Sequence, residues 1–287
     1  MPKSRHAIFR ALWWSCNLLV VVAFLVVLSS GFREFSLRYY LDGFSDAIAP
    51  SVLSAESKVQ AILDCMRVEP SRAVVTNLDT LSPRDPHLTL NYQQLLRICG
   101  TATNAFLNLA REDDLAVLRL LLLGPDGNTK HVAAEVLLDR RWIVVDPTYH
   151  VIMKDAQGRF LTRQDLQNSS LFNEAVGSIP NYPLDYNYEH TTHVRLERVP
   201  LLAKLHLRRL LDAVFPSWDE AADRSLLLER ESFFYLTLAS LAALFLFLVR
   251  FLLGGYADSR LRIRRFHLRD RALRAGSAFL RAPEIEQ

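Results

Sequence analysis

Two long runs of uncharged, mostly apolar residues lie near the two ends of this 287-residue chain, and they constrain its fold more than any other feature. The first run covers residues 11–30 and the second covers residues 232–249. Twenty residues in an α-helix span about 30 Å, which is the hydrocarbon thickness of a typical bilayer. We therefore predict transmembrane helices at residues 11–31 and 231–253, with one folded domain between them.

Each run also has an alternative interpretation. The first could be a cleaved signal peptide, with Val27 and Ser29 as a weak cleavage site. It is longer than the roughly 7–15 apolar residues of a signal peptide, however, and Trp13 and Trp14 stand near its end, where membrane helices favour indole rings. The second run could be a buried core helix, but an arginine cluster follows it directly. Membrane spans remain the favoured interpretation of both runs.

Basic residues gather at both ends of the chain, although its net charge is only +3. Residues 256–287 contain eight arginines and four carboxylates, a balance of +4, and residues 1–10 carry a further +3. The chain between them therefore carries −4. Basic flanks of membrane helices stay on the cytoplasmic side. Both termini are thus predicted to be cytoplasmic.

This orientation divides the chain into a cytoplasmic head (1–10), an extracytoplasmic domain (32–230) and a cytoplasmic arginine-rich tail (254–287). The domain would be periplasmic in a Gram-negative host. The tail could instead be a nucleic-acid-binding arm, but its position beside a membrane helix favours contact with anionic lipid. We therefore expect membrane lipid as a partner and no nucleic acid.

Between the two runs, the residue pattern changes from helical to strand-like. Apolar residues recur at helical spacing over 51–66 and 92–111, which predicts a helix in each stretch. Residues 69–90 between them are rich in Pro and Asp and predict a loop. Strand-like runs and turn residues then predict strands at 115–123, 131–138 and 142–145, with turns at 124–128 and 139–141. Residues 150–195 show no resolvable pattern, and residues 199–215 predict an amphipathic helix. Helices followed by antiparallel strands indicate an α+β domain.

The three cysteines, Cys16, Cys65 and Cys99, are too few for a disulfide framework, and their spacing is not that of a zinc site. His190 and His193 form a pair without nearby carboxylate or thiol ligands, so we interpret them as surface residues and predict no metal. The sequence contains no glycine-rich phosphate loop, and we expect no cofactor.

Cys99, His131 and Asp146 together predict thiol chemistry. Cys99 begins the apolar-striped part of the second helix, where the helix dipole favours a thiolate. A nucleophilic thiol also needs a histidine within reach and a third group that orients the histidine. A hairpin with its turn at residues 139–141 would bring His131 and Asp146 to within a residue or two of being cross-strand neighbours.

The stretch from about Asn91 to Met153 resembles the core of the transglutaminase-like cysteine enzymes, which are related to papain. In that family, a Cys opens a helix with a Leu-Ala-Arg-like end, and a His-x-x-x-Glu-Val strand and a Trp shortly before an Asp-Pro pair follow. The matching residues are Cys99, Leu109-Ala110-Arg111, His131 with Glu135-Val136, and Trp142 with Asp146-Pro147. Two departures are visible. Trp142 stands four residues before the Asp rather than three, and Ile98 replaces an acidic or small polar residue.

The resemblance implies a papain-like fold, in which the helix carrying Cys99 packs on an antiparallel sheet, and a Cys99–His131–Asp146 triad. The implied substrate is a protein or peptide amide, attacked by the thiolate to give a thioester. Relatives include cross-linkers, peptidases, amidases and acyltransferases, so the choice between hydrolysis and transfer stays open. The alternative from another class is a non-catalytic scaffold that binds envelope proteins.

The groups that would stabilise an oxyanion are less defined. The backbone N–H of Cys99 is the default donor. Gln93, six residues upstream, is a candidate second donor by analogy with papain-like relatives, and Gln94 and Tyr92 are equal candidates.

Overall fold

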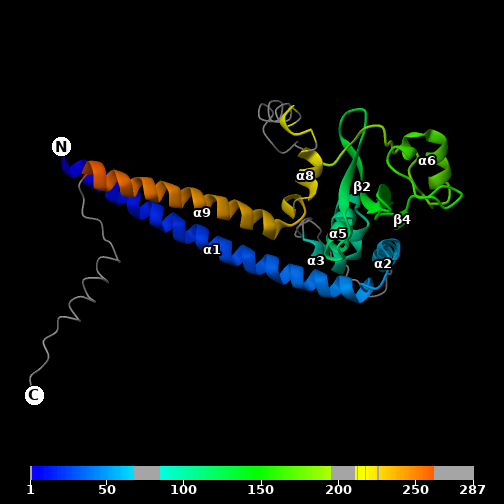
Figure 1. Ribbon diagram of the computed structural model, residues 1–287, viewed down its shortest axis with the longest axis horizontal. Helices are drawn as coiled ribbons and strands as arrows, with labels where there is room; N and C mark the ends of the chain where they lie inside the picture. The colour runs from blue at the N-terminus through cyan, green and yellow to red at the C-terminus, as the bar shows by residue number, and fades with distance from the viewer. Residues whose placement is uncertain are drawn as a thin grey trace, which may run out of the picture. The chain divides into compact units, whose positions relative to one another are not determined.

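The computed structural model describes residues 2–67, 85–194, 211, 213–216, 218–224 and 226–261. The chain divides into two compact units. One consists of Met1–Leu28 with Leu238–Gln287, and the other is Ser29–Thr237. Two long helices, α1 (Pro2–Ile48) and α9 (Glu231–Tyr256), contribute to both units. Figure 1 shows these helices and the elements between them.

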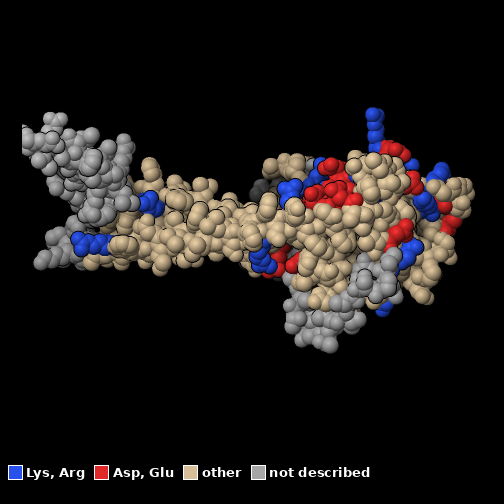
Figure 2. Space-filling view, turned by 90° about the horizontal axis from the view of Figure 1, so that it is seen from below, with Lys and Arg blue, Asp and Glu red and all other residues tan. Residues whose placement is uncertain are grey.

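Both long helices are apolar enough to cross a membrane, as their composition predicts. Within the first unit, the Nε atom of Arg250 donates to Oδ1 of Asn17 over 2.9 Å, and its guanidinium lies 5.1 Å from the ring centroid of Trp13. The face of this unit seen in Figure 2 is almost free of charged side chains, in contrast to the mixed charges around the sheet. Helix α1 continues without interruption past residue 31, where the sequence predicted that a membrane helix would end.

The short helices of the second unit begin later than predicted or were missed. Helix α2 (Ala55–Arg67) starts after Ser54, whose hydroxyl accepts from the backbone N–H of Ser57, so the prediction that it begins at residue 51 was wrong. Helix α3 (Pro86–Asn91) lies in the predicted loop. Its N-cap Asp85 accepts from the backbone N–H of His87 and Leu88, and Pro86 occupies the first helical position.

The predicted helix over 92–111 is two helices, α4 (Gln93–Leu96) and α5 (Cys99–Glu112). They are separated at Ile98, which has extended backbone angles of −97° and 122° and serves as the N-cap of α5. Because the helix restarts at this point, Cys99 occupies its first position. Ten of the fourteen residues of α5 are buried, which makes it the central helix of the second unit.

An antiparallel five-stranded sheet packs against α5 in the order β4-β3-β2-β1-β5. Its strands are β1 (Val117–Leu123), β2 (Thr129–Leu138), β3 (Arg141–Asp146), β4 (Val151–Ile152) and β5 (Thr191–Thr192). The α+β prediction is therefore confirmed, and the three predicted strands correspond to β1, β2 and β3.

The β2–β3 hairpin fixes the register of the sheet. Asp139 and Arg140 both have positive φ, as a tight two-residue hairpin turn requires, and Leu138 pairs with Arg141. Successive side chains along each strand point to opposite faces of the sheet. Ala134 and Val136 pack toward α5 in one apolar cluster, whereas Ala133 and Val144 face a second cluster.

The second apolar cluster is built from the segment that showed no pattern in the sequence. It contains Phe172 from α6 (Ser169–Val176) and the tyrosines Tyr182 and Tyr188. The predicted helix over 199–215 lies almost wholly outside the described residues, as does the arginine-rich tail beyond residue 261. Short helical segments complete the second unit: η2 (Asp165–Gln167), α8 (Trp218–Arg224) and η3 (Leu226–Leu228).

A buried ionic cluster lies at the C-terminal end of α5, and we call it the Arg230 cluster. Arg230 is fully buried, and its guanidinium donates to three side chains. Nε reaches Asn108 Oδ1 over 2.5 Å, Nη1 reaches Glu34 Oε1 over 2.8 Å and Nη2 reaches Glu112 Oε1 over 2.6 Å. The Ser232 hydroxyl donates to the other oxygen of Glu34. These contacts join α1, α5 and the start of α9.

Candidate active site

Cys99 lies at the N-terminus of α5, half-buried and unbridged. The first N–H groups of a helix have no intrahelical acceptor, and Ile98 offers no side-chain cap. The thiol therefore stands where the helix dipole favours negative charge. Thr103, one turn further on, donates its hydroxyl to the carbonyl of Val132 over 2.9 Å, which ties the start of α5 to β2.

His131 and Asp146 form a buried pair on the neighbouring strands. The Nε2 atom of His131 lies 2.7 Å from Oδ2 of Asp146, and both side chains are almost inaccessible. The register explains this contact, because Ala134 pairs with Val145 and the two residues therefore approach each other diagonally across the hairpin. The sequence predicted this proximity. The structure places both residues on the sheet face that carries the second apolar cluster.

The carboxylate of Asp146 is held by donors from three directions. Besides His131, the Tyr182 hydroxyl donates to Oδ2 over 3.1 Å. The backbone N–H groups of Thr148 and Tyr149 donate to Oδ1 over 3.0 and 3.4 Å. The side chain is thus fixed in one orientation, and it fixes the imidazole in turn.

The second imidazole nitrogen, Nδ1, is the atom available to Cys99. Nδ1 is buried and has no hydrogen-bond partner among the described nitrogen and oxygen atoms. Burial by itself acts to raise the pKa of the Cys99 thiol, but the hydrogen bond and charge of His131, with backbone contributions from Val132 and Gly100, lower that pKa below its ordinary value. The three residues singled out by the sequence are therefore brought together.

The ionisation of His131 responds to both neighbours. Burial favours the neutral imidazole, yet the hydrogen bond and charge of Asp146 and the adjacent Cys99 outweigh it and raise the pKa of His131 to about 9. A thiol with a lowered pKa beside an imidazole with a raised pKa favours the thiolate–imidazolium pair. A thiolate is the nucleophilic form of cysteine, and an imidazolium can donate a proton to a leaving group.

Aromatic side chains enclose the imidazole, and sequence reasoning missed them. The Tyr186 ring stacks on His131 with centroids 4.3 Å apart and an angle of 15° between the planes. Tyr149 lies 6.1 Å from the imidazole, and Tyr182 donates to Asp146 while contacting Tyr188 through its hydroxyl. Burial and the nearby charge of Asp146 raise the pKa values of Tyr182 and Tyr188, so both phenols stay neutral. The tyrosine-rich composition of residues 182–188 was the available signal.

Two other sequence predictions have different outcomes. His193 is buried rather than exposed, because its Nδ1 contacts the carbonyl of Arg119 over 2.6 Å and its Nε2 lies 3.7 Å from Glu135. The interpretation of His193 as a surface residue was therefore wrong, while His190 is exposed as expected. Among the described residues, no group of three or more potential ligands could hold a metal ion.

Gln93, the proposed second oxyanion donor, is the first residue of α4 and is half-buried. Tyr92 and Gln94 flank it and are also half-buried, so these three candidates remain predictions of equal standing. The backbone N–H groups of Gly100 in α5 and Val132 in β2 both contact the Cys99 thiol, so they are backbone donors that an oxyanion on a Cys99 adduct would meet.

Comparison of the chain with protein-family models, with curated proteins and with solved structures finds no match.

Proposed function

We propose that this chain is a membrane-anchored thiol enzyme of the transglutaminase-like type that acts on an amide bond of a protein or peptide. The observation that carries the proposal is the buried 2.7 Å contact between His131 and Asp146, with the free imidazole nitrogen serving a cysteine at a helix start. The order Cys, His, Asp and a Cys-bearing helix against an antiparallel sheet are those of a papain-like core.

The proposed reaction proceeds in two steps. The Cys99 thiolate attacks the amide carbon, the carbon–nitrogen bond breaks and His131 donates its proton to the departing amine, which leaves a thioester. In the second step, His131 takes a proton from water or from an amine, which attacks the thioester and restores the thiolate. Water gives a peptidase or amidase, and an amine gives an acyltransferase or cross-linker. Asp146 holds the imidazole in the tautomer and orientation that both steps need.

A direct test compares the reactivity of cysteines within one molecule. The full-length protein in detergent micelles is treated with limiting iodoacetamide at pH 7, and labelling of Cys65 and Cys99 is read by mass spectrometry. Both are unbridged and half-buried, so Cys65 serves as an internal control. The proposal expects Cys99 to react much faster than Cys65. Equal rates would support the alternative, a non-catalytic scaffold that binds envelope proteins.

The substrate can then be sought by comparing envelope extracts treated with wild-type protein and with Cys99→Ala. Peptides cleaved, deamidated or cross-linked only by the wild type would identify the acyl donor and the second reactant. A Cys99→Ala protein with wild-type activity would contradict the assignment.

We further propose that both termini are cytoplasmic and that the domain with Cys99 faces the outside of the cytoplasmic membrane. The supporting observations are two helices of spanning length and the clustered arginines after the second. A reporter enzyme that works only in the periplasm should be active when fused after residue 220 and inactive when fused after Gln287. The reverse pattern would place the thiol chemistry in the cytoplasm.

A further inference from the structure

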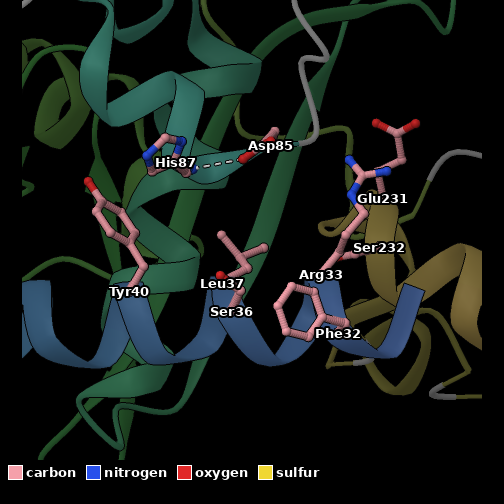
Figure 3. Close-up of a pocket in the computed structure, with 9 residues that line it drawn as sticks. All are labelled: Phe32, Arg33, Ser36, Leu37, Tyr40, Asp85, His87, Glu231 and Ser232. Carbon is pink, nitrogen blue, oxygen red and sulfur yellow. Dashed lines mark hydrogen bonds between the residues drawn. The ribbon is translucent and has the colours of Figure 1, made fainter. Parts of the chain in front are cut away.

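Two features of the second unit lie outside the proposed triad. One is a cavity of about 320 Å³ lined by α1, the start of α3 and the start of α9 (Figure 3). Figure 3 shows the Arg33 side chain extending toward Glu231, so opposite charges of the chain itself face each other at that end of the cavity. The other feature is Tyr186, whose ring covers one face of the buried His131 imidazole. Of the two features, Tyr186 is the one that contacts a group of the proposed reaction.

The contact between Tyr186 and His131 is a close parallel stack. The ring centroids lie 4.3 Å apart and the planes differ by 15°. Neutral rings in the same cluster meet differently, since the Tyr149 and Tyr182 planes differ by 50° and the Tyr182 and Tyr186 planes by 82°. Tilted contacts are expected there, because the negative faces of two neutral π-systems repel each other. A protonated imidazole is instead attracted to the face of a ring within about 6 Å. The stack therefore suits the imidazolium form of His131.

Two buried tyrosines hold Tyr186 over the imidazole. The Tyr182 hydroxyl donates to Oδ2 of Asp146 over 3.1 Å and contacts the Tyr188 hydroxyl over 3.2 Å. The carbonyl of Tyr188 accepts a hydrogen bond from the side chain of Gln167 over 3.3 Å. The chain is thus fixed on both sides of Tyr186 by contacts that do not involve the thiol.

The stack acts on His131 from a direction that its other neighbours leave open. The other titratable groups that face His131 among the described residues are Cys99 at the start of α5, Asp146 at the end of β3 and Tyr149 just after it. Asp146 and Cys99 act at the ring nitrogens, close to the plane of the imidazole, whereas Tyr186 lies on its face. Burial by itself lowers the pKa of His131. The attraction between a ring face and a cation acts in the opposite direction.

We propose that Tyr186 is a positioning residue of the thiol reaction: its ring holds the His131 imidazole in the plane that serves Cys99 and favours the cation that protonates the leaving amine. This inference rests on the proposed function and adds a residue to the same site. The ring, and not the hydroxyl, carries the effect. Its expected size is about one unit in the pKa of His131, as for a partly desolvated contact between a cation and a ring.

Fluorination of the ring tests the proposal with little change of shape. Fluorine atoms withdraw charge from the ring face and weaken its attraction for a cation, while the cover over the imidazole stays in place. Full-length protein in detergent micelles is prepared as Tyr186→Phe and with 3,4,5-trifluorophenylalanine at the same position. The pKa of His131 is measured by NMR of labelled imidazoles, and His131→Gln identifies its signal. Tyr186→Phe should keep the pKa of about 9, and the trifluoro ring should lower it by about one unit.

The thiol gives a second readout in the same proteins. The pH of half-maximal iodoacetamide labelling at Cys99 should rise with the trifluoro ring, because a less stable imidazolium stabilises the thiolate less. Tyr186→Leu, which keeps an apolar side chain but has no π-face, should shift both quantities in the same direction. Tyr39→Phe is the control, since it changes an exposed ring and should shift neither.

Two results would overturn the proposal. One is a His131 pKa that is the same with the trifluoro ring as in Tyr186→Phe. The other is a Tyr186→Phe protein in which that pKa has already fallen by the full amount, which would assign the effect to the hydroxyl. Failure of the proposed function has a different signature: Cys99 of the wild type would show ordinary thiol reactivity while the His131 pKa still responds to fluorination.

Discussion

Helix α5 has a buried polar cluster at each end, and the two clusters differ in how completely their groups are paired. At the C-terminal end, Arg230 uses all of its guanidinium nitrogens on Asn108, Glu34 and Glu112. At the N-terminal end, the His131 Nδ1 atom has no nitrogen or oxygen partner among the described atoms, and Cys99 beside it is half-buried.

Under the proposed function, this difference separates a structural cluster from a chemical one. Buried ions are tolerated in a fold when each is paired and hydrogen-bonded. The Arg230 cluster meets that condition, because each nitrogen of the guanidinium donates to a side chain. A buried nitrogen without such a partner needs another explanation, and a thiol that titrates with it supplies one. In that proposal, the same helix is anchored at its C-terminal end and presents the nucleophile at its N-terminal end.

The largest effect is expected from a substitution that disrupts the N-terminal cluster but keeps Cys99. Asp146→Asn leaves a side chain of the same shape, but it no longer holds His131 in the required tautomer. We expect the rate of Cys99 acylation by an amide or activated ester substrate to fall by about 10²–10⁴. Stopped-flow or single-turnover measurement checks this, with circular dichroism to show that the fold is retained. A variant that keeps its acylation rate would remove Asp146 from the mechanism.

The next largest effect is expected on stability, from a substitution that disrupts the C-terminal cluster. Arg230→Met leaves the buried Glu34 without its cation and removes one of the two cations near the half-buried Glu112, so the free energy of unfolding should fall by about 3–5 kcal/mol. Thermal unfolding in detergent measures the loss. Arg38→Gln is the control, since Arg38 is exposed and lies 3.9 Å from Glu112, so it should change stability by less than about 1 kcal/mol.

The comparison predicts a further result for Arg230→Met. Below its unfolding temperature, the rate of iodoacetamide labelling at Cys99 should match that of the wild type, because the Arg230 cluster takes no part in the chemistry. A large fall in labelling of the still-folded variant would show that the two ends of α5 are coupled.

A smaller effect is expected where the tyrosines support Asp146. Tyr182→Phe removes one buried hydrogen bond to a carboxylate but keeps the ring, so stability should fall by about 1.5–3 kcal/mol. The rate of acylation should fall less than it does in the Asp146→Asn variant, because His131 and two backbone N–H groups still hold the carboxylate. Tyr39→Phe, which removes a hydroxyl from an exposed ring, should leave both quantities unchanged.

The mildest test varies only the pH. The lowered pKa of Cys99 predicts that its labelling by iodoacetamide reaches its half-maximal rate at a lower pH than labelling of a free thiol such as glutathione. Acylation by an amide should also fall as the pH rises through about 9, because His131 then loses the proton that the leaving amine needs. On each side of its maximum, the rate of acylation should change at most about tenfold for each pH unit. His131→Ala should move the labelling curve of Cys99 upward in pH and abolish the high-pH fall.

Local sequence patterns were sufficient to predict several parts of this protein. The two apolar runs predicted α1 and α9, and the strand-like apolar runs on either side of residues 139–141 predicted the β2–β3 hairpin. Because a hairpin turn fixes cross-strand register, His131 and Asp146 could be expected to meet from a separation of fifteen residues. The apolar stripe after Cys99 also indicated a dipole position for the thiol, although the predicted helix began at residue 92 and the break at Ile98 was missed.

Other features depend on contacts between distant parts of the chain. The side chains that surround the imidazole come from residues 149–188, where short segments and loops give no periodic signal. The burial of His193 depends on Glu135 and Arg119, which lie 58 and 74 residues before it in the sequence. The Arg230–Glu34 pair joins residues 196 positions apart. Periodicity indicates which face of an element is apolar, but only tertiary packing decides which polar groups are enclosed together and which buried atoms lack a hydrogen-bond partner.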